Sequence, residues 1–431
     1  MVRSWLRETT GGLPATFWYL WVATLVSRLG GFVLIFLAVY LTKERGFSDI
    51  QAGLVVGLWG AGGAIGTMVG GLLADRWGRR PTLLLANGGA AVMMLAMGLS
   101  HELWMIATCA FLLGTVAEAA RPAFAAMMVD VVPERDRVRA FSLNYWAINL
   151  GFASAAIVGG FAAHVDYLLL FVVDAATTLA TAAIVFRKVR ETRPAASAPS
   201  SRGVGTATAG GLGIVLRDRV FLTFAAVNLL TAMVFLQHIS MLPIAMTDDG
   251  LSSSTYGWVI ALNGVLIVLG QLFVPKLVGD RRRVRLLALS AVVIGIGFGL
   301  TALAADAWLY ALTVIVWTSG EMIWSPSAAT SVAELSPASM RGRYQGVFGV
   351  SWAVAGFASP LLGGFVRETL GNSALWLGCA AVTFFAAAVH LASGPARERR
   401  AAMMAAAQTP APPAADGSVI SDTLAPAAAP S

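Results

Sequence analysis

The sequence predicts an all-α polytopic membrane protein in which 12 transmembrane helices form two six-helix repeats. Three observations predict this fold class. The 431 residues are 57% hydrophobic and only 12% charged, whereas about a quarter of the residues in a soluble domain are charged. The hydrophobic residues occur in blocks of about 20, the length that a helix needs to cross about 30 Å of hydrocarbon. Features of the first half of the chain also recur in the second half at one fixed spacing.

Twelve apolar blocks, separated by polar breaks, define the expected spans. They cover residues 15–41, 50–74, 81–100, 103–129, 140–163, 166–187, 219–245, 254–278, 284–304, 306–331, 342–366 and 372–394. The first block is too long for the core of a signal peptide and lacks a small-residue cleavage site. We therefore expect it to remain in the protein as the first span.

The spans divide the chain into four parts. Residues 1–187 form an N-terminal six-helix half, and residues 219–394 form a C-terminal six-helix half. Between them, residues 188–218 are rich in Ala, Ser, Gly, Thr and Arg, which is typical of a linker, here expected in the cytoplasm. Residues 395–431 are mostly Ala, Pro, Ser and Thr after the sequence RERR, which predicts a disordered cytoplasmic tail.

The basic residues indicate the orientation of the spans. Of the 30 Lys and Arg residues, 25 lie in the termini and loops of one face, whereas only Lys43, Arg45 and Arg367 lie in loops of the other. Because cytoplasmic loops carry the excess of Lys and Arg, this distribution predicts a protein of the cytoplasmic membrane with both termini in the cytoplasm. The net charge of +7 is thereby explained without a nucleic-acid partner. Cys109 and Cys379 lie inside apolar blocks, so we expect packing residues and no metal site or cofactor.

An internal repeat relates the two halves. Several residues coincide when the second half is shifted by 204 positions. The matched pairs are Gly46 with Gly250, Gly60 with Gly264, Pro122 with Pro326, and the sequence GGF at 159–161 with GGF at 363–365. A single offset that holds over most of a half predicts a duplication, as in transporters built from parallel repeats.

The loop between the second and third spans carries the sequence GGLLADRWGRRP, which resembles the signature of the major facilitator superfamily. The matching residues that we single out are Gly71, Asp75, Arg76, Gly78, Arg79 and Arg80. Small residues at the end of a span let another helix approach closely, and an aspartate can accept hydrogen bonds from the N-terminus of a facing helix. The resemblance implies a loop that latches the two halves together on the cytoplasmic side, and it covers almost all of the chain before the tail.

Five ionisable residues inside the spans are candidates for the substrate cavity and for proton coupling, because a charge within the bilayer is costly. They are Arg28, Glu118, Arg121, Asp174 and Glu321. One interpretation is structural: these charges pair with one another, for example Arg28 with Glu118, to hold helices together. The other is that Glu118 or Glu321 takes up and releases a proton, since desolvation favours a neutral carboxyl group and a nearby cation favours the ionised one. Arg121 is either a relay partner for Glu118 or a side chain that extends towards water.

The fifth span contains LNYWAINLG at 143–151, which resembles the same span of bacterial multidrug/proton antiporters. Relatives of the lactococcal multidrug exporter carry an aspartate where this chain has Asn144. Asparagine cannot titrate, so coupling would depend on the glutamates. Trp146, Trp317, Trp324 and Trp352 lie in or near the expected cavity-lining spans, and such a wall suits amphipathic or cationic organic compounds.

Together these features predict a secondary active transporter, not an enzyme, that works by alternating access. We expect a monomer whose partners are a small-molecule substrate, protons and the lipid bilayer, and whose function is proton-coupled efflux of small hydrophobic or drug-like compounds. The alternative is an uptake permease for a nutrient such as a sugar, an amino acid or a small peptide; a membrane receptor that transports nothing is a third class. The sequence has no GxxxxGK[ST] loop, which argues against ATP as the energy source.

Overall fold

The computed structural model describes residues 11–192, 209–270, 281–337 and 340–408, and within these ranges the chain forms helices and no strand. Eleven of the described helical segments are long and apolar enough to cross a membrane. The remaining expected span is helix α16, Ala307–Leu335, which at 29 residues is also long enough but carries Thr318, Ser319 and Glu321 near its middle. The predicted fold class is confirmed.

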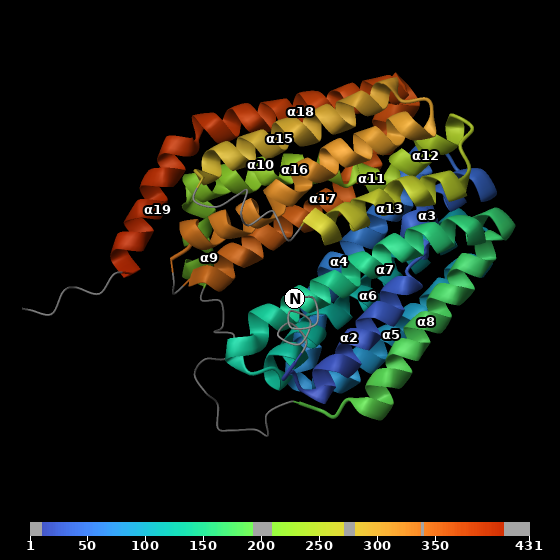
Figure 1. Ribbon diagram of the computed structural model, residues 1–431, viewed down its shortest axis with the longest axis horizontal. Helices are drawn as coiled ribbons and strands as arrows, with labels where there is room; N and C mark the ends of the chain where they lie inside the picture. The colour runs from blue at the N-terminus through green and yellow to red at the C-terminus, as the bar shows by residue number, and fades with distance from the viewer. Residues whose placement is uncertain (1–10, 193–208, 271–280, 338–339, 409–431) are drawn as a thin grey trace, which may run out of the picture.

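By length and composition, six segments of each half can cross a membrane, and Figure 1 shows the two groups of helices that they form. In the N-terminal half these are α2 (Ala15–Leu29) with α3 (Val33–Val39) and a π-helical turn (Tyr40–Glu44), α4 (Asp49–Arg76), α5 (Arg79–Leu99), α6 (Leu103–Val131), α7 (Arg137–Val165) and α8 (Tyr167–Lys188). In the C-terminal half they are α10 (Arg219–Phe235) with α11 (Gln237–Ser240) and α12 (Leu242–Asp248), α13 (Ser253–Gly270), α15 (Arg283–Leu300), α16, α17 (Arg341–Leu370) and α18 (Asn372–Ala392).

The same local structure follows the first span in both halves. Gly46 and Gly250 adopt positive φ angles of 69° and 81°, a conformation that glycine reaches at little cost. Two residues later, the hydroxyl groups of Ser48 and Ser252 accept hydrogen bonds from backbone N–H groups in the first turn of the next helix, α4 or α13. These equivalent turns lie 204 residues apart and support the predicted duplication.

The halves contact each other along two seams that lack bulky side chains. On α4, Gly53, Gly57 and Gly60 lie against the backbone of α17 around residues 356–361. On α13, Gly257 and Gly264 lie against α7 near Ala156 and Asn149. Because glycine has no Cβ, the backbones approach within van der Waals distance, as at the interfaces of packed membrane helices.

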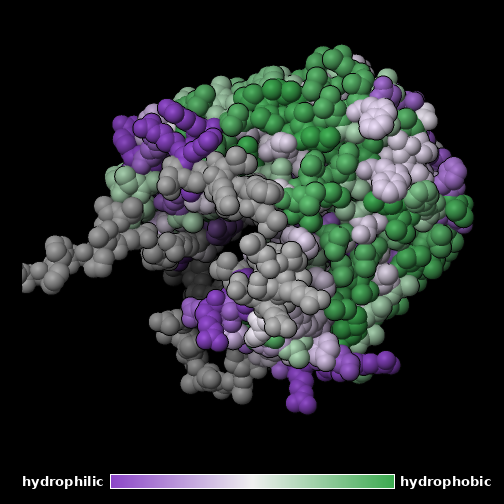
Figure 2. All heavy atoms as spheres, in the orientation of Figure 1, coloured by the Kyte–Doolittle hydropathy of each residue, from purple (hydrophilic) through white to green (hydrophobic). Residues whose placement is uncertain are grey.

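The seams join the halves at one end only. Near the other end, Gly346 and Gly349 of α17 have no atom within 4 Å of the position that a Cβ would take. Figure 1 shows the halves together on the right and apart on the left, and Figure 2 shows a hollow between them on the left. We call the joined side, which carries Lys43 and Arg367, the closed end, and the separated side, which carries Arg79 and Arg283, the open end.

Among the described residues, two α-helices lie outside the spans. Helix α9, Ala209–Arg217, lies within the predicted linker 188–218, and helix α19, Gly394–Gln408, occupies the start of the tail that was predicted to be disordered over 395–431. The sequence GPARERRAAMMAAAQ is rich in Ala, Arg and Met, which favour helix, and Arg400 ties α19 to the C-terminal half through an ion pair of 2.6 Å with Asp218. Residues 193–208 and 409–431 lie outside the described residues.

We predict that Gly57→Ala destabilises the joined conformation. The added methyl group would lie 2.7 Å from the carbonyl oxygen of Phe357, and backbone cannot move aside as a flexible side chain can. Overpacking of this kind typically costs about 1–3 kcal/mol. We therefore expect a lower thermal unfolding midpoint in detergent and weaker cross-linking of α4 to α17.

The matched control is Gly88→Ala on α5, where the new Cβ would have no neighbour within 4 Å. Alanine raises helix propensity by up to about 1 kcal/mol over glycine, so this variant should be as stable as the wild type or more so. Equal stability of the two variants would contradict the close approach of α4 to α17.

Candidate functional site

Ion pairs between the halves close one end of the molecule. Lys43, in the π-helical turn, lies 2.5 Å from Asp248 at the end of α12. Arg367 of α17 binds Asp248 at 2.5 Å and also pairs with Asp49 in the first turn of α4. Lys43 and Asp49 belong to the N-terminal half, and Asp248 and Arg367 belong to the C-terminal half. We call these four residues the closed-end network.

The negative charge of Asp248 connects the network, because it pairs with both Lys43 and Arg367. Burial alone raises the pKa of its carboxyl group, but hydrogen bonds from Lys43 and Arg367 and their positive charges outweigh burial, so the pKa lies below its ordinary value of 3.8. A depressed carboxyl pKa means that the pairing is fully present above the ordinary pKa. It is lost only as the pH falls through the lower value in the folded protein. The network is therefore intact at neutral pH.

The sequence analysis did not identify the closed-end network, although it held a signal. Lys43 and Arg367 are two of the three basic residues that break the predicted charge distribution. A cation on the face that otherwise excludes cations needs a local anion, and both residues have one in the structure.

In the N-terminal half, the predicted residues Arg28, Glu118 and Arg121 lie near one another. The carboxylate of Glu118 pairs with Arg121 one turn along α6, with an oxygen to nitrogen distance of 3.5 Å. The side chain of Arg121 is 80% exposed and that of Glu118 is 25% exposed. Arg28, whose backbone packs against Gly151 of α7, is within electrostatic range of Glu118 but forms no direct ion pair among the described residues. The direct partner of Glu118 is therefore Arg121 and not Arg28.

Asp174 of α8 occupies a different kind of position. The residue is 4% exposed, and its carboxylate accepts a hydrogen bond of 3.1 Å from the backbone N–H of Val33. Val33 begins α3 just after the break at residues 30–32 in the first span. A carboxylate satisfies the free N–H groups at a helix start, so Asp174 stabilises this break from a buried position.

In the C-terminal half, Glu321 lies near the middle of α16 beside a neutral partner. The side-chain N–H of Asn263 on α13 donates to the Glu321 carboxylate at 2.7 Å and to the hydroxyl of Thr318 at 3.1 Å. Among the described residues, no cation acts on Glu321 at close range. Asn263 was missed by the sequence analysis; its signal is an amide within the apolar stretch IALNGVLIVL.

The other polar and aromatic candidates lie in different surroundings. Asn144 of α7 is 8% exposed, and its side-chain oxygen has no hydrogen-bond partner in the described part of the chain. Trp324 and Trp352 stack with ring centroids 5.4 Å apart, and Trp146 is 38% exposed. Trp317 is fully buried, so it packs in the core and does not line a cavity.

The predicted latch loop is fastened to its own half. Gly78 has a φ of 116°, which turns the chain between α4 and α5. The backbone N–H groups of Arg79 and Arg80 both donate to Glu191 at 3.0 Å, and the Arg79 guanidinium lies 3.2 Å from Asp130. All of these partners belong to the N-terminal half or its extension, so the loop has a rigid local structure even where the halves are apart.

Asp75, Arg76 and Gly71 lie at the end of α4 before this turn. Asp75 is exposed, and no hydrogen bond or ion pair is found for it among the residues that the structure describes. Gly71 has open space where a Cβ would be. The latch across the halves thus stays a prediction; of the residues predicted to form it, Asp75 and Arg76 are exposed at the open end.

Two six-helix halves that are joined at one end and separated at the other, with ionisable groups between their helices, define a multi-pass membrane transporter. A family model described as Major Facilitator Superfamily matches residues 20–360. The chain belongs to this superfamily. Its members are transporters and not enzymes.

The individual relatives described below have low sequence identity to this chain. The chain is 24% identical to the "Na(+), Li(+), K(+)/H(+) antiporter" of Planococcus maritimus over 76% of this chain and 83% of that protein. It is 27% identical to the "Multidrug resistance protein MdtH" of Klebsiella pneumoniae (strain 342) over 85% and 91%. The crystal structure of a POT family transporter in complex with 5-aminolevulinic acid superposes with a TM-score of 0.76 at 14% identity, covering 90% of this chain and 98% of that chain, which shows a common fold.

We predict that Asp248→Asn weakens the closed end. The amide cannot pair with the cations Lys43 and Arg367, and partly exposed pairs of this kind contribute up to about 1 kcal/mol each. The population with a separated closed end should rise several-fold. Distances between spin labels on the two halves at this end, measured by double electron–electron resonance, provide the test.

Glu102→Gln is the matched control, because Glu102 is an exposed acid before α6 at the same end and its side chain caps no helix. This variant should leave the distance distribution unchanged. If Asp248→Asn also leaves it unchanged, the closed-end network does not hold the halves together.

Proposed function

We propose that the protein is a proton-coupled secondary transporter that works by alternating access and exports small hydrophobic compounds. The names of two relatives support this direction, since one is a multidrug resistance protein and the other exchanges cations for protons. Uptake of a nutrient is the second candidate. A POT family structure resembles the chain in fold alone, so it leaves this candidate open without favouring it.

The orientation follows from the basic residues. Arg79 and Arg80 of the latch loop and Arg281–Arg283 at the start of α15 lie at the open end, with most other loop cations. The excess of Lys and Arg in cytoplasmic loops assigns this end to the cytoplasm. In the proposed cycle the structure is therefore the inward-open state, in which a substrate enters from the cytoplasm.

The observation that carries proton coupling is the environment of Glu321. Its carboxylate has a neutral hydrogen-bond partner, Asn263, and no cation at close range among the described residues, whereas Glu118 has Arg121. Desolvation favours the protonated form of a carboxyl group, and an adjacent cation favours the ionised form. Of the two glutamates, Glu321 is thus better placed to gain and lose a proton as water access to the hollow changes.

The closed-end network and the latch loop fit opposite states of the same cycle. Opening towards the outside separates Asp49 from Arg367 and Lys43 from Asp248. Closing the cytoplasmic side brings Asp75 towards the C-terminal half, where it can accept hydrogen bonds from a helix N-terminus. Trp352, which is partly exposed and stacks on the buried Trp324, offers an aromatic face to an apolar or cationic organic substrate.

The decisive experiment measures pH-driven transport in vesicles for Glu118→Gln, Glu321→Gln and the double variant. Glutamine keeps the shape and hydrogen bonding of glutamate but carries no exchangeable proton. Glu321→Gln should still bind substrate and exchange it down its own gradient, but should lose nearly all transport driven by a pH gradient. Glu118→Gln serves as the matched control and should keep most of its pH response. A double variant that responds to the pH gradient like the wild type would contradict coupling through these carboxylates. In the same experiment, the direction in which the pH gradient drives the substrate across the membrane distinguishes export from uptake.

The latch can be tested at Asp75. Asp75→Asn should insert normally but transport several-fold more slowly, because a neutral amide holds the cytoplasmic ends together less well than a carboxylate. Glu134→Gln, which also removes an exposed acid at the open end, is the control and should transport at the wild-type rate. Normal transport by Asp75→Asn at equal abundance would remove the latch role.

A further inference from the structure

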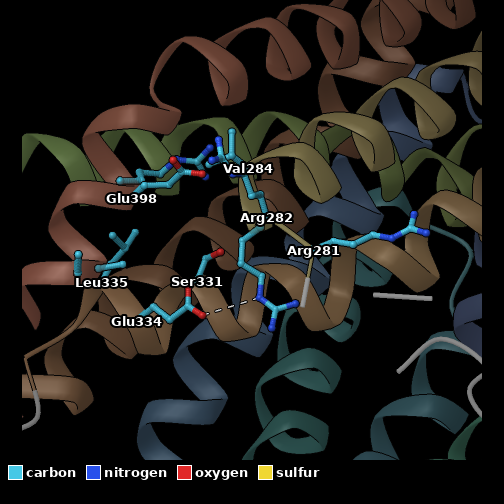
Figure 3. Close-up of a pocket in the computed structure, with 11 residues that line it drawn as sticks. Arg281, Arg282, Val284, Ser331, Glu334, Leu335 and Glu398 are labelled. Carbon is cyan, nitrogen blue, oxygen red and sulfur yellow. Dashed lines mark ion pairs between the residues drawn. The ribbon is translucent and has the colours of Figure 1, made fainter. Parts of the chain in front are cut away.

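A second polar site lies outside the transport pathway, at the open end of the C-terminal half. It is a pocket of about 510 Å³ between the start of α15, the end of α16 and the start of α19, within the size range of ligand sites (Figure 3). Its charged lining residues are Arg281, Arg282, Arg283, Arg397, Glu334 and Glu398. Four arginines against two glutamates leave the pocket positively charged.

The glutamates do not neutralise these arginines. The ion pair between Arg283 and Glu334 is long, at 3.8 Å, and joins side chains that are 31% and 41% exposed, so it contributes little. Arg281 and Arg282 are exposed, and neither forms an ion pair within the described residues. Figure 3 shows Arg281 on the side of the pocket opposite to Glu398.

The start of α15 adds to the positive potential. The helix begins at Arg283, and Arg282 in the N-cap position provides no capping side chain. The backbone N–H groups of a first turn and the helix dipole attract anions, above all phosphate groups. A helix start alone does not make a binding site, but here it lies beside an unusual arginine.

Arg397 on α19 is that residue. It is 4% exposed, its Nε has no hydrogen-bond partner in the described part of the chain, and its guanidinium lies 5.7 Å from the ring of Phe224. One Nη donates to the carbonyl oxygen of His390 at 2.7 Å, which leaves most of the charge uncompensated. Burial lowers the pKa of Arg397 to about 10, although the negative charge of Glu398 acts in the opposite direction. The rule that places cations in cytoplasmic loops explains exposed arginines, but it does not explain one that is buried and forms no direct ion pair among the described residues.

Apolar surface continues from the pocket towards the membrane. Leu289 on α15 and Leu391 on α18 are 47% and 54% exposed near the ends of their spans. In Figure 2 the hydrophilic patch at the upper left meets the hydrophobic surface of the C-terminal half. An anion that reaches the pocket from this side would have its hydrophobic part against these helices.

We propose that this pocket binds the phosphate group of an anionic phospholipid, with the acyl chains along α15 and α18. Arginines bind phosphate through paired charge-assisted hydrogen bonds, and basic pockets between membrane helices accept lipid headgroups. The bound phosphate neutralises Arg397 and joins α15, α16 and α19. The site lies apart from the residues proposed for proton coupling, so it does not depend on the transport mechanism.

The test uses the purified full-length protein in neutral detergent, with native mass spectrometry to count bound lipid. Dioleoyl phosphatidylglycerol is the probe, and dioleoyl phosphatidylcholine is its zwitterionic control. The pocket variant combines Arg281→Gln with Arg282→Gln, two exposed positions that should not affect folding. The matched control combines Arg285→Gln with Arg399→Gln, which removes the same charge from exposed positions at the same end, outside the pocket.

We expect the wild type to prefer phosphatidylglycerol and the pocket variant to lose roughly tenfold or more of this affinity, since each surface arginine contributes about 1 kcal/mol. The control variant should lose affinity for phosphatidylglycerol as well, but its loss, expressed as the logarithm of the fold-change, should be less than half that of the pocket variant. Equal losses in the two variants, or equal binding of the two lipids, would overturn the site. Displacement of phosphatidylglycerol by millimolar inorganic phosphate would overturn the lipid assignment and indicate a site for free phosphate.

Discussion

The close approach of two helix pairs, α4 with α17 and α7 with α13, is the constraint on which the rest of the structure depends. Backbones can meet only where side chains are absent, and glycines such as Gly57 and Gly257 provide this along the joined part of each seam. A smooth backbone contact has no interdigitated side chains that must separate when one half rotates on the other. The closed-end network stabilises the joined end, because its ion pairs connect the two halves beside these backbone contacts. The hollow at the open end follows from this arrangement.

Charge inside the membrane imposes the second constraint, and the protein meets it in three ways. Asp174 is buried, and its carboxylate accepts a hydrogen bond from the backbone N–H of Val33 at the start of α3. The bond gives the buried carboxylate a partner and also occupies a backbone N–H that the break in the helix would leave free. Glu118 is paired with Arg121 on the same helix face. Glu321 is held by an amide from a neighbouring helix. Asp174 also lies in the field of Arg28, so Glu321 is the one of these three acids on which no cation acts among the described residues. The three positions are therefore not equivalent.

The fold was largely predictable because its signals are local. Apolar blocks, polar breaks and an offset of 204 residues need no knowledge of contacts, and the observed helices begin and end within a few residues of most predicted spans. The site was less predictable, because its partners are distant in sequence. Asp49 and Arg367 form an ion pair although they lie 318 positions apart in the sequence, and the residues around either one do not indicate its partner. Helix α19 was missed for another reason: the Pro-rich composition of the whole tail concealed a short stretch of strong helix formers that Arg397 and Arg400 attach to the C-terminal half.

Arg121 shows how the geometry of the halves bears on the proposed coupling. Its side chain is 80% exposed within a membrane span, and a guanidinium that faced hydrocarbon would be costly, so in the proposed inward-open state we infer that it faces water between the halves. Closing the open end removes that water. A buried cation that loses its water is stable only beside an anion. Glu118 is the ion-pair partner of Arg121, but its negative charge also acts on Arg28. Closure therefore favours a second anion near this helix, either a deprotonated carboxylate from the other half or an acidic group on the substrate. In the proposed cycle, the movement of the two halves would thus be sensitive to the protonation of a residue such as Glu321, without any direct contact between that residue and the ion pairs of the closed end.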